Sequence, residues 1–154
     1  MDNEAKIVIA DDNVILANFI KEYIENNSNF KIYKLVNSSK QEIEMLEVEK
    51  VDIIITDIMR NGEEISGLDI IQKAEKYKKK ERFILLTASS KQEIEYLTNH
   101  ELPENIVGYI KKPFKDWNEI IQAIENAIIK LKEEDVEKNN FEPRNIIGRI
   151  KKRI

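Results

Sequence analysis

Acidic, hydroxyl and basic side chains follow four apolar segments of the chain, and together they could bind and transfer a phosphoryl group. Asp11 and Asp12 follow the first segment, Asp57 the third, Thr87 ends the fourth, and Lys112 comes just after the fifth. Crowded carboxylates need a neutralising cation, and oxygen ligands favour a hard divalent ion such as Mg²⁺. An ammonium group and a hydroxyl can pair with phosphoryl oxygens. The set therefore predicts a phosphoryl site with Mg²⁺ as its cofactor.

Taken one at a time, these aspartates have a simpler interpretation. Aspartate is common at helix starts, so Asp12 or Asn13 could cap the helix that follows, and Asp57 could belong to an ordinary loop. The phosphoryl hypothesis depends on whether the fold brings the side chains together.

The elements that would position them alternate between strand and helix. Five apolar runs, bounded by polar turns, are Lys6–Ala10, Phe30–Val36, Val51–Thr56, Arg82–Thr87 and Ile106–Ile110. The first, third and fourth are nearly continuous in Ile, Val and Leu, which is typical of central strands covered on both faces. The second run carries Lys31 and Lys34, as an edge strand would.

Helical periodicity fills the intervals between these runs. Apolar residues recur at helical spacing in Val14–Glu25 and Leu68–Tyr77. Three further helix starts are predicted from capping patterns: Ser39 with Glu42, Ser90 with Glu93, and Asp116 with Glu119. The last helix is the longest and runs from Asp116 toward Glu134.

This alternation predicts an α/β fold of the (βα)5 kind, a doubly wound parallel five-stranded sheet with the flavodoxin-like strand order 2-1-3-4-5. In that order, a ligand crevice lies at the carboxyl ends of the first and third strands. The aspartates, Thr87 and Lys112 should therefore share one rim of the sheet. This convergence favours a phosphoryl site over a set of unrelated helix caps.

Four segments carry a family resemblance: IVIADDN at 7–13, IIITDIM at 53–59, ILLTAS at 84–89 and YIKKPF at 109–114. In order, spacing and letters they resemble the signature segments of the response regulator receiver domain of bacterial two-component systems, over residues 6–133. The resemblance implies a phosphoaccepting signal-transduction protein that takes a phosphoryl group from a histidine kinase and controls transcription through an output domain. Such a protein is not an enzyme, although it assists its own phosphorylation and dephosphorylation.

The resemblance also implies roles for the acidic residues. Asp57 corresponds to the phosphoacceptor. Asp12, Asp57 and the backbone carbonyl of Met59 correspond to Mg²⁺ ligands, and Asp11 would hold a metal-bound water.

Three further residues match the switch of the family. Thr87 corresponds to the switch hydroxyl, Tyr109 to the switch aromatic that packs on the helix after Ser90, and Lys112 to the phosphate-pairing lysine. Lys112 is chosen over Lys111 because it directly precedes Pro113, and Lys111 should point elsewhere. The Lys112–Pro113 bond is expected to be cis.

The sequence departs from the family pattern in two places. Asn61 stands where the family commonly has a proline, and the Ser66–Gly67 turn comes about two positions late. A few extra residues are placed in Asn99–Asn105. These departures affect the entry to the helix at Leu68 and the surface of the helix after Ser90, and they leave the acidic residues in place.

The sequence lacks the residues that other functions of the same fold class require. A flavodoxin would need a glycine- and hydroxyl-rich phosphate loop where this chain has acids, and the GxxxxGK[ST] pattern of nucleotide-binding P-loops does not occur. An aspartate-based phosphatase would usually need a second acid where Asn13 stands. The remaining alternative is a receiver-like protein interaction module that acts without phosphorylation. The single histidine, His100, is expected to be solvated, with the donor histidine on the partner.

Charge divides the chain. Residues 143–154 hold five of the 25 basic residues and none of the 29 acidic ones. We expect a receiver domain at 1–134, and at 135–154 a charged linker and a basic amphipathic tail with one isoleucine stripe, Ile146, Ile147, Ile150 and Ile154. The tail is interpreted as the start of an output domain. Any contact with DNA would be made only through that domain. The competing hypothesis is a single-domain regulator whose tail packs on its own receiver or on a second copy.

Partners and location follow from the same observations. The expected partner is a sensor histidine kinase or a phosphotransfer protein of a phosphorelay, with a homodimer through the face formed by the helix after Ser90, the strand at 106–110 and the last helix. The chain has no cysteine, which excludes disulfides and cysteine-ligated metals and suits a reducing compartment. Without an apolar run of membrane-spanning length or a signal sequence, a cytoplasmic protein with no membrane contact is expected.

Overall fold

The structure is a computed structural model that describes residues 5–58, 66–77 and 79–140. Its strands are β1 (Ile7–Ala10), β2 (Ile32–Val36), β3 (Ile53–Thr56), β4 (Arg82–Thr87) and β5 (Ile106–Lys111). Its helices are α1 (Val14–Asn27), α2 (Ser39–Val48), α3 (Gly67–Lys76), α4 (Lys91–Leu97) and α5 (Asn118–Asn140). All strand pairs are parallel and the order is β2-β1-β3-β4-β5. The predicted (βα)5 fold and strand order are confirmed.

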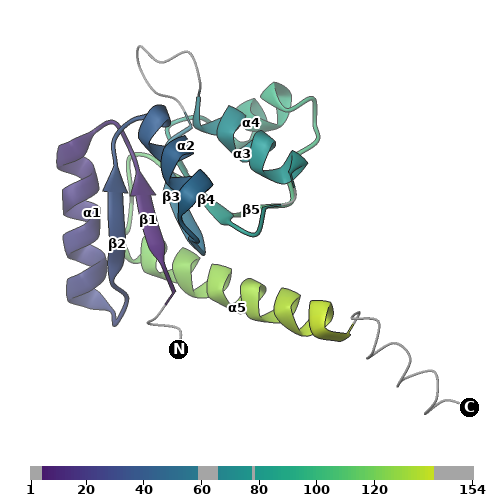
Figure 1. Cartoon of the computed structure of the whole chain (residues 1–154). Coiled ribbons are helices and arrows are strands. Elements are labelled where there is room, and N and C mark those ends of the chain that lie inside the picture. Colours follow the sequence, from purple (N-terminus) through teal and green to yellow (C-terminus); the bar gives the residue numbers. More distant parts are fainter. Residues whose placement is uncertain (1–4, 59–65, 78, 141–154) are drawn as a thin grey trace, which may run out of the picture.

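Helices cover both faces of the sheet (Figure 1). Helices α1 and α5 pack on one face, against alternate strand residues such as Ile7 and Ile9. Helices α2, α3 and α4 cover the other face, where their buried side chains share one core with strand residues such as Val8, Ala10 and Leu85. Because each central strand is buried on both sides, its sequence is continuously apolar and does not alternate.

Helix starts in the structure agree only partly with the predicted caps. Ser90 and Glu93 form the expected reciprocal capping box. At α2, however, the N-cap is Ser38, whose side chain accepts from the backbone N–H of Gln41, while Ser39 is the first helical residue and is buried. The expected Ser39 cap is wrong because Ser38 has the extended backbone that an N-cap requires.

At the start of α5, the Asp116 side chain accepts from a backbone N–H of the helix, as predicted, although Asp116 does not directly precede the first helical residue. The Asp116 carboxylate accepts from the N–H of Asn118, two residues on, and the helix begins at Asn118. Trp117 therefore separates Asp116 from the helix, and Glu119 is the second helical residue.

Helix α3 begins with a capping box that the sequence analysis did not identify, between Ser66 and Asp69. The next residue, Gly67, donates its N–H to the carbonyl of Ile58. A Cβ atom at Gly67 would collide with the backbone carbonyl oxygen of Asp57. Glycine is thus needed here because α3 starts against the end of β3.

Helix α5 is longer than predicted and continues past Glu134 to Asn140. Its Glu134 carboxylate pairs with the Arg82 guanidinium at the start of β4, with a shortest distance of 2.7 Å. Residues 135–140, expected as a linker, are helical because their sequence has no proline or glycine to stop the helix. The predicted amphipathic tail lies outside the described residues.

The loop after α4 contains two residues with left-handed backbone conformation, Asn99 (φ 55°) and His100 (φ 63°). The N–H of His100 donates to the carbonyl of Glu95, which closes the helix end in a Schellman-like arrangement. His100 is exposed, as predicted. Within the described part of the chain, no helix has both the length and the apolar character needed to cross a membrane.

Glu25 gives the fold a testable pH dependence. Its carboxylate accepts from the backbone N–H of Ile32, the first residue of β2, at 2.9 Å and from Lys21 at 3.1 Å. The Ile32 bond, helped by Lys21, lowers the pKa of Glu25 below its ordinary value of 4.5. A carboxylate with a lowered folded pKa stabilises the protein above its unfolded pKa, and this contribution is lost as the pH falls through the folded value.

We therefore expect Glu25→Gln to lower the free energy of unfolding at pH 7 by about 1 kcal/mol, because the charge-assisted bonds become neutral ones. The difference from the unmodified protein should shrink as the pH falls below about 4.5. Urea titrations at several pH values measure this. Glu22→Gln, an exposed change on the same helix, is the control, and an effect of Glu25→Gln that is the same at every pH would contradict the assignment.

Candidate functional site

The predicted site residues lie together at the carboxyl end of the sheet because each directly follows a strand. The backbone N–H groups of Asp11, Asp57 and Lys112 each donate to the carbonyl of the last residue of the neighbouring strand, at 3.0, 3.0 and 2.8 Å. These three bonds extend the strand pairing by one residue. They fix where each side chain leaves the sheet.

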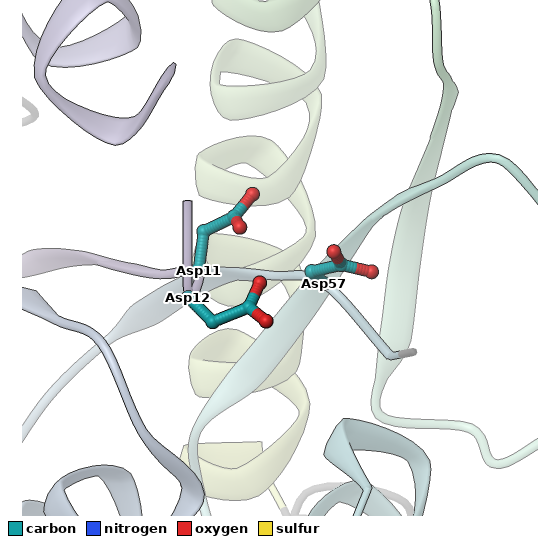
Figure 2. A group of neighbouring side chains, drawn as sticks. All are labelled: Asp11, Asp12 and Asp57. Carbon is teal, nitrogen blue, oxygen red and sulfur yellow. The ribbon is translucent and has the colours of Figure 1, made fainter. Parts of the chain in front are cut away.

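Three carboxylates form a cluster at this rim (Figure 2). One oxygen each from Asp11, Asp12 and Asp57 lies within 4.8 Å of the others. Asp11 is 1% and Asp57 8% exposed, whereas Asp12 is exposed. The cluster therefore has a buried side and a side open to solvent.

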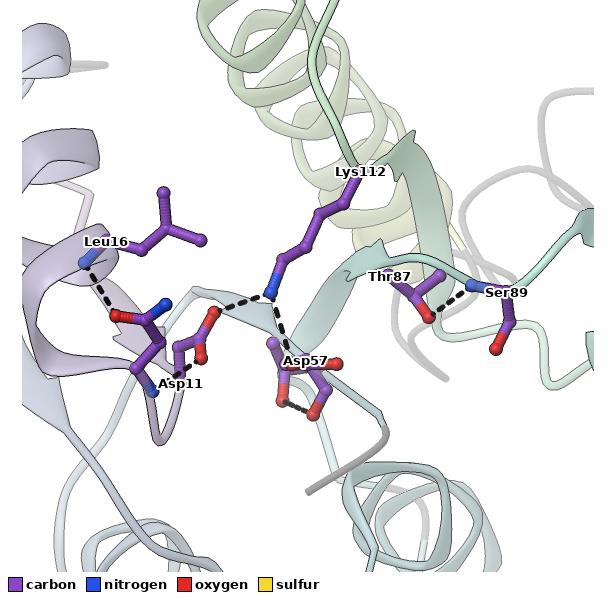
Figure 3. Close-up of polar contacts among 8 residues, drawn as sticks. Asp11, Leu16, Asp57, Thr87, Ser89 and Lys112 are labelled. Atoms are coloured by element: carbon purple, nitrogen blue, oxygen red, sulfur yellow. Dashed lines mark hydrogen bonds and ion pairs between the residues drawn. The ribbon is translucent and has the colours of Figure 1, made fainter. Parts of the chain in front are cut away.

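Lys112 neutralises the buried side of the cluster (Figure 3). Its Nζ atom lies 3.0 Å from Asp11 Oδ2 and 3.2 Å from Asp57 Oδ2. Burial alone lowers the pKa of Lys112, but the two carboxylates outweigh it and raise the pKa above the ordinary value of 10.5. Lys112 is thus held protonated between them, whereas Lys111 is exposed, which agrees with the predicted choice between the two lysines.

Asn13 orients Asp11 at the start of α1. The Asn13 N–H donates to Asp11 Oδ1 at 2.8 Å, and the Asn13 side chain accepts from the N–H of Leu16 as the N-cap of the helix. Both oxygens of Asp11 are therefore occupied, one by this turn and one by Lys112. Of the two caps considered for α1, the structure has Asn13, which leaves the Asp12 carboxylate to the cluster.

Thr87 and Tyr109 are linked through the backbone of one residue. The Thr87 hydroxyl is completely buried and accepts from the N–H of Ser89 at 3.1 Å. The Tyr109 hydroxyl donates to the carbonyl oxygen of the same Ser89. Burial, with a smaller contribution from Glu93, raises the pKa of Tyr109 above 10.0. The Thr87 and Tyr109 hydroxyls are therefore connected through the backbone of Ser89.

An aromatic cluster fixes the loop that carries Lys112. The Lys112–Pro113 peptide bond is cis, as expected. Just beyond it, Phe114 packs edge-on against Trp117 with 5.0 Å between ring centroids, and Trp117 contacts Tyr23 of α1 at 5.7 Å. The sequence analysis missed this cluster, since its members are distributed over two elements, and it attaches the loop to α1.

The acidic cluster fits a Mg²⁺ ion. Mg²⁺ is commonly held by one or two carboxylates and keeps several waters, and this cluster offers hard oxygen ligands with Asp12 on its solvent side. Asp12 and Asp57 would be direct ligands, and Asp11 would act through water. The fourth predicted ligand, Met59, lies outside the described residues, as does the departure at Asn61.

We expect Asp12→Ala to weaken Mg²⁺ binding by about tenfold or more, because it removes a charged ligand from a site that keeps few protein ligands. The melting temperature without Mg²⁺ should not fall, since Asp12 is exposed and its loss relieves repulsion within the cluster. Isothermal titration with MgCl₂ measures the affinity. Asp135→Ala, an exposed change on α5, is the control, and equal Mg²⁺ affinities for both variants would refute this role.

Comparison with known proteins agrees with this geometry. Residues 7–125 match the response regulator receiver domain family, and the chain belongs to this family. A curated relative, the nitrate/nitrite response regulator protein homolog of Haemophilus influenzae, is 25% identical over 145 residues, covering 88% of this chain and 69% of the relative.

Solved structures of receiver domains have the same fold. A response regulator receiver domain protein from Clostridium thermocellum is 26% identical, with a TM-score of 0.67 over 83% of this chain and 97% of its own. The response regulatory domain of mrkE from Klebsiella pneumoniae is 20% identical, also with a TM-score of 0.67, over 83% and 98%. The receiver domain predicted from four short segments is therefore confirmed as the family of this chain, which places it in two-component signalling.

Proposed function

We propose that the chain is a phosphoaccepting response regulator in which Asp57 receives a phosphoryl group from a phosphohistidine. The observation that carries this proposal is the position of Lys112 between the carboxylates of Asp11 and Asp57, at the rim where Asp12 also lies. Once Asp57 is phosphorylated, the Lys112 ammonium group can pair with an oxygen of the phosphoryl group. The chain would act as a phosphoacceptor that assists its own phosphorylation and dephosphorylation. It would not act as an enzyme on a separate substrate.

In the proposed transfer, an Asp57 carboxylate oxygen forms a bond to phosphorus while the bond from phosphorus to the donor imidazole nitrogen breaks. The imidazole leaves with the electron pair of that bond. Lys112 stabilises the transferred phosphoryl oxygens, and Asp11 helps to hold Lys112 in place. A Mg²⁺ ion bound by Asp12 and Asp57 would offset the negative charge of the carboxylates and the phosphoryl group.

The switch that we propose begins at Thr87. When its hydroxyl turns toward the new phosphoryl group, it gives up the hydrogen bond from the Ser89 N–H. The Ser89 carbonyl, which accepts from Tyr109, then changes position, and Tyr109 follows. These movements would favour the active conformation of the domain, in which the face formed by α4, β5 and α5 is rearranged.

Kinase-free labelling tests the phosphoacceptor proposal. Acetyl phosphate and Mg²⁺ should add one phosphoryl group to the protein, detected by intact mass, and removal of Mg²⁺ with EDTA should abolish the reaction. Labelling that is unaffected by EDTA would contradict the proposed site. No labelling at all would support the alternative, a receiver-like interaction module that acts without phosphorylation.

The donor protein would dock on the first half of α1. Val14, Ile15 and Phe19 are 47%, 72% and 57% exposed, and Val14 comes two residues after Asp12. Exposed apolar side chains grouped beside a charged site are typical of an interaction surface. This patch suits a sensor histidine kinase or a phosphotransfer protein, whose histidine must approach Asp57.

We expect Phe19→Ala to slow transfer from a purified phosphorylated histidine phosphotransfer domain by roughly tenfold, as for a contact near the centre of an interface. Labelling by acetyl phosphate should stay within about twofold, because Phe19 is 57% exposed on α1 and is not one of the predicted site residues. Rapid-quench assays with both donors measure this. Val48→Ala, a change at an even more exposed apolar residue on α2, is the control. An equal loss with both donors would mean that Phe19 affects the site itself.

Exposed apolar residues of α4 mark a further surface for interaction. Tyr96 and Leu97 of α4 are 74% and 53% exposed, which supports a homodimer through the face of α4, β5 and α5.

One structural neighbour, RcsB from Salmonella enterica, was solved bound to a promoter. We propose transcription control for this chain as well, with DNA contacted through an output domain outside residues 1–134. The cysteine-free sequence agrees with a cytoplasmic site of action.

A further inference from the structure

Both partners of the ion pair between Asp11 and Lys112 are attached to the same helix, α1. The Asp11 carboxylate accepts from the backbone N–H of Asn13, which caps α1. The other Asp11 oxygen lies 3.0 Å from the Lys112 Nζ atom (Figure 3). On the Lys112 side, the attachment is made by aromatic rings of the loop that follows β5. A movement of this loop relative to α1 would therefore displace one charge relative to the other.

Three rings make this attachment. Phe114 and Trp117 meet nearly at right angles with 5.0 Å between their centroids, and the Trp117 ring lies 5.7 Å from that of Tyr23 on α1. All three side chains are partly buried against the core that α1 and α5 share on this face of the sheet. The Trp117 carbonyl also accepts from the N–H of Ile120 in α5. Trp117 thus joins the loop to both helices.

The backbone of this loop makes few hydrogen bonds. The N–H of Lys112 donates to the carbonyl of Thr87, which fixes the end of the loop nearest β5. Between Lys112 and Trp117, the N–H groups of Phe114 and Lys115 donate to no other described residue. Packing between aromatic rings at these distances is favourable and depends on their orientation. The middle of the loop is therefore held against α1 by the rings.

We propose that Trp117 is a positioning residue for Lys112: it holds the loop against α1 and so keeps the ammonium group between Asp11 and Asp57. The inference rests on the proposed phosphoacceptor function, in which Lys112 stabilises the transferred oxygens. The alternative is that Trp117 only packs in the core. Leu131 of α5 packs against the same core outside the loop and represents that alternative. The two roles differ because a positioning residue loses its effect on the reaction when Lys112 is absent.

Labelling of the full chain by acetyl phosphate and Mg²⁺ tests this dependence in a double-mutant cycle. We expect Trp117→Ala to slow labelling about fivefold, because the loss of the ring contacts lets the loop move. Trp117→Phe, which keeps an aromatic ring, should stay within about twofold of the unmodified protein. In the Lys112→Ala background, Trp117→Ala should slow labelling by less than about twofold further. Leu131→Ala, the control, should change labelling by less than about twofold in both backgrounds.

Unfolding in urea without Mg²⁺ provides a second cycle that does not depend on phosphorylation. In the unmodified chain, Trp117→Ala lowers the folding equilibrium constant through two losses, the ring packing and the well-placed charge beside Asp11. In the Lys112→Ala background only the ring packing is lost. We therefore expect the factor by which Trp117→Ala lowers the constant to be at least about threefold smaller there. Leu131→Ala should have the same effect in both backgrounds.

Equal effects of Trp117→Ala with and without Lys112, in either cycle, would show that Trp117 is only a core residue and would overturn the proposal. If the unmodified protein is not labelled at all, the phosphoacceptor function fails, while the unfolding cycle still tests Trp117. If the double variant does not fold, the labelling rates of the single variants are compared. Slower labelling of Trp117→Ala, but not of Trp117→Phe or Leu131→Ala, then supports the role, and any other order contradicts it.

Discussion

Replacing Asp57 with asparagine should lower the rate of labelling by acetyl phosphate by at least about 100-fold, because the amide is a poor nucleophile while the side chain keeps its shape. Asp57 is only 8% exposed and lies 3.2 Å from Lys112, so the isosteric change preserves the packing of the rim. Intact mass after timed incubation with acetyl phosphate and Mg²⁺ measures the rate.

The stability of Asp57→Asn provides the control. Removing one of three clustered negative charges relieves repulsion, and Lys112 keeps its contact with Asp11. The melting temperature without Mg²⁺ should therefore stay the same or rise. A variant that is folded and labelled as fast as the unmodified protein would refute the assignment of Asp57.

The second large effect concerns Lys112. Lys112→Ala should slow labelling by about tenfold or more, because the variant lacks the ammonium that stabilises the transferred oxygens. It should also lower the free energy of unfolding by about 2–3 kcal/mol without Mg²⁺, since the buried Asp11 carboxylate loses its cation. Adding Mg²⁺ should restore most of the lost stability, because the ion offsets the same carboxylates.

Lys111 supplies a matched control one residue away. Lys111 is exposed, so Lys111→Ala should leave both the labelling rate and the Mg²⁺-free stability nearly unchanged. Thermal melts with and without MgCl₂, together with the labelling assay, compare the two variants. If Lys111→Ala and Lys112→Ala behave alike, Lys112 has no special part in the site.

The sequence predicted the fold and the grouping of the site well because both depend on periodic, local signals. Strands buried on both faces have continuous apolar runs, and residues that directly follow parallel strands must share a rim. Asp11, Asp57 and Lys112 come together for this reason. The choice of Lys112 over Lys111 came from the family pattern at Pro113, and the exposed position of Lys111 agrees with it.

Features that depend on tertiary contact were not predictable in the same way. The link between Thr87 and Tyr109 passes through backbone atoms of Ser89, so no side-chain signal could indicate it. The sequence offered adjacent serines at the start of α2, and only the backbone conformation selects Ser38 as the cap.

Locating the phosphoryl group on the chain tests the central claim most directly. The protein is labelled with acetyl phosphate and Mg²⁺, the acyl phosphate is reduced with borohydride to the corresponding alcohol, and the modified residue is found by peptide mass spectrometry. The account predicts modification at position 57 and, under the same conditions, none at Asp11 or Asp12. A stable phosphoryl group on another residue such as His100, or an unmodified Asp57 in labelled protein, would contradict it.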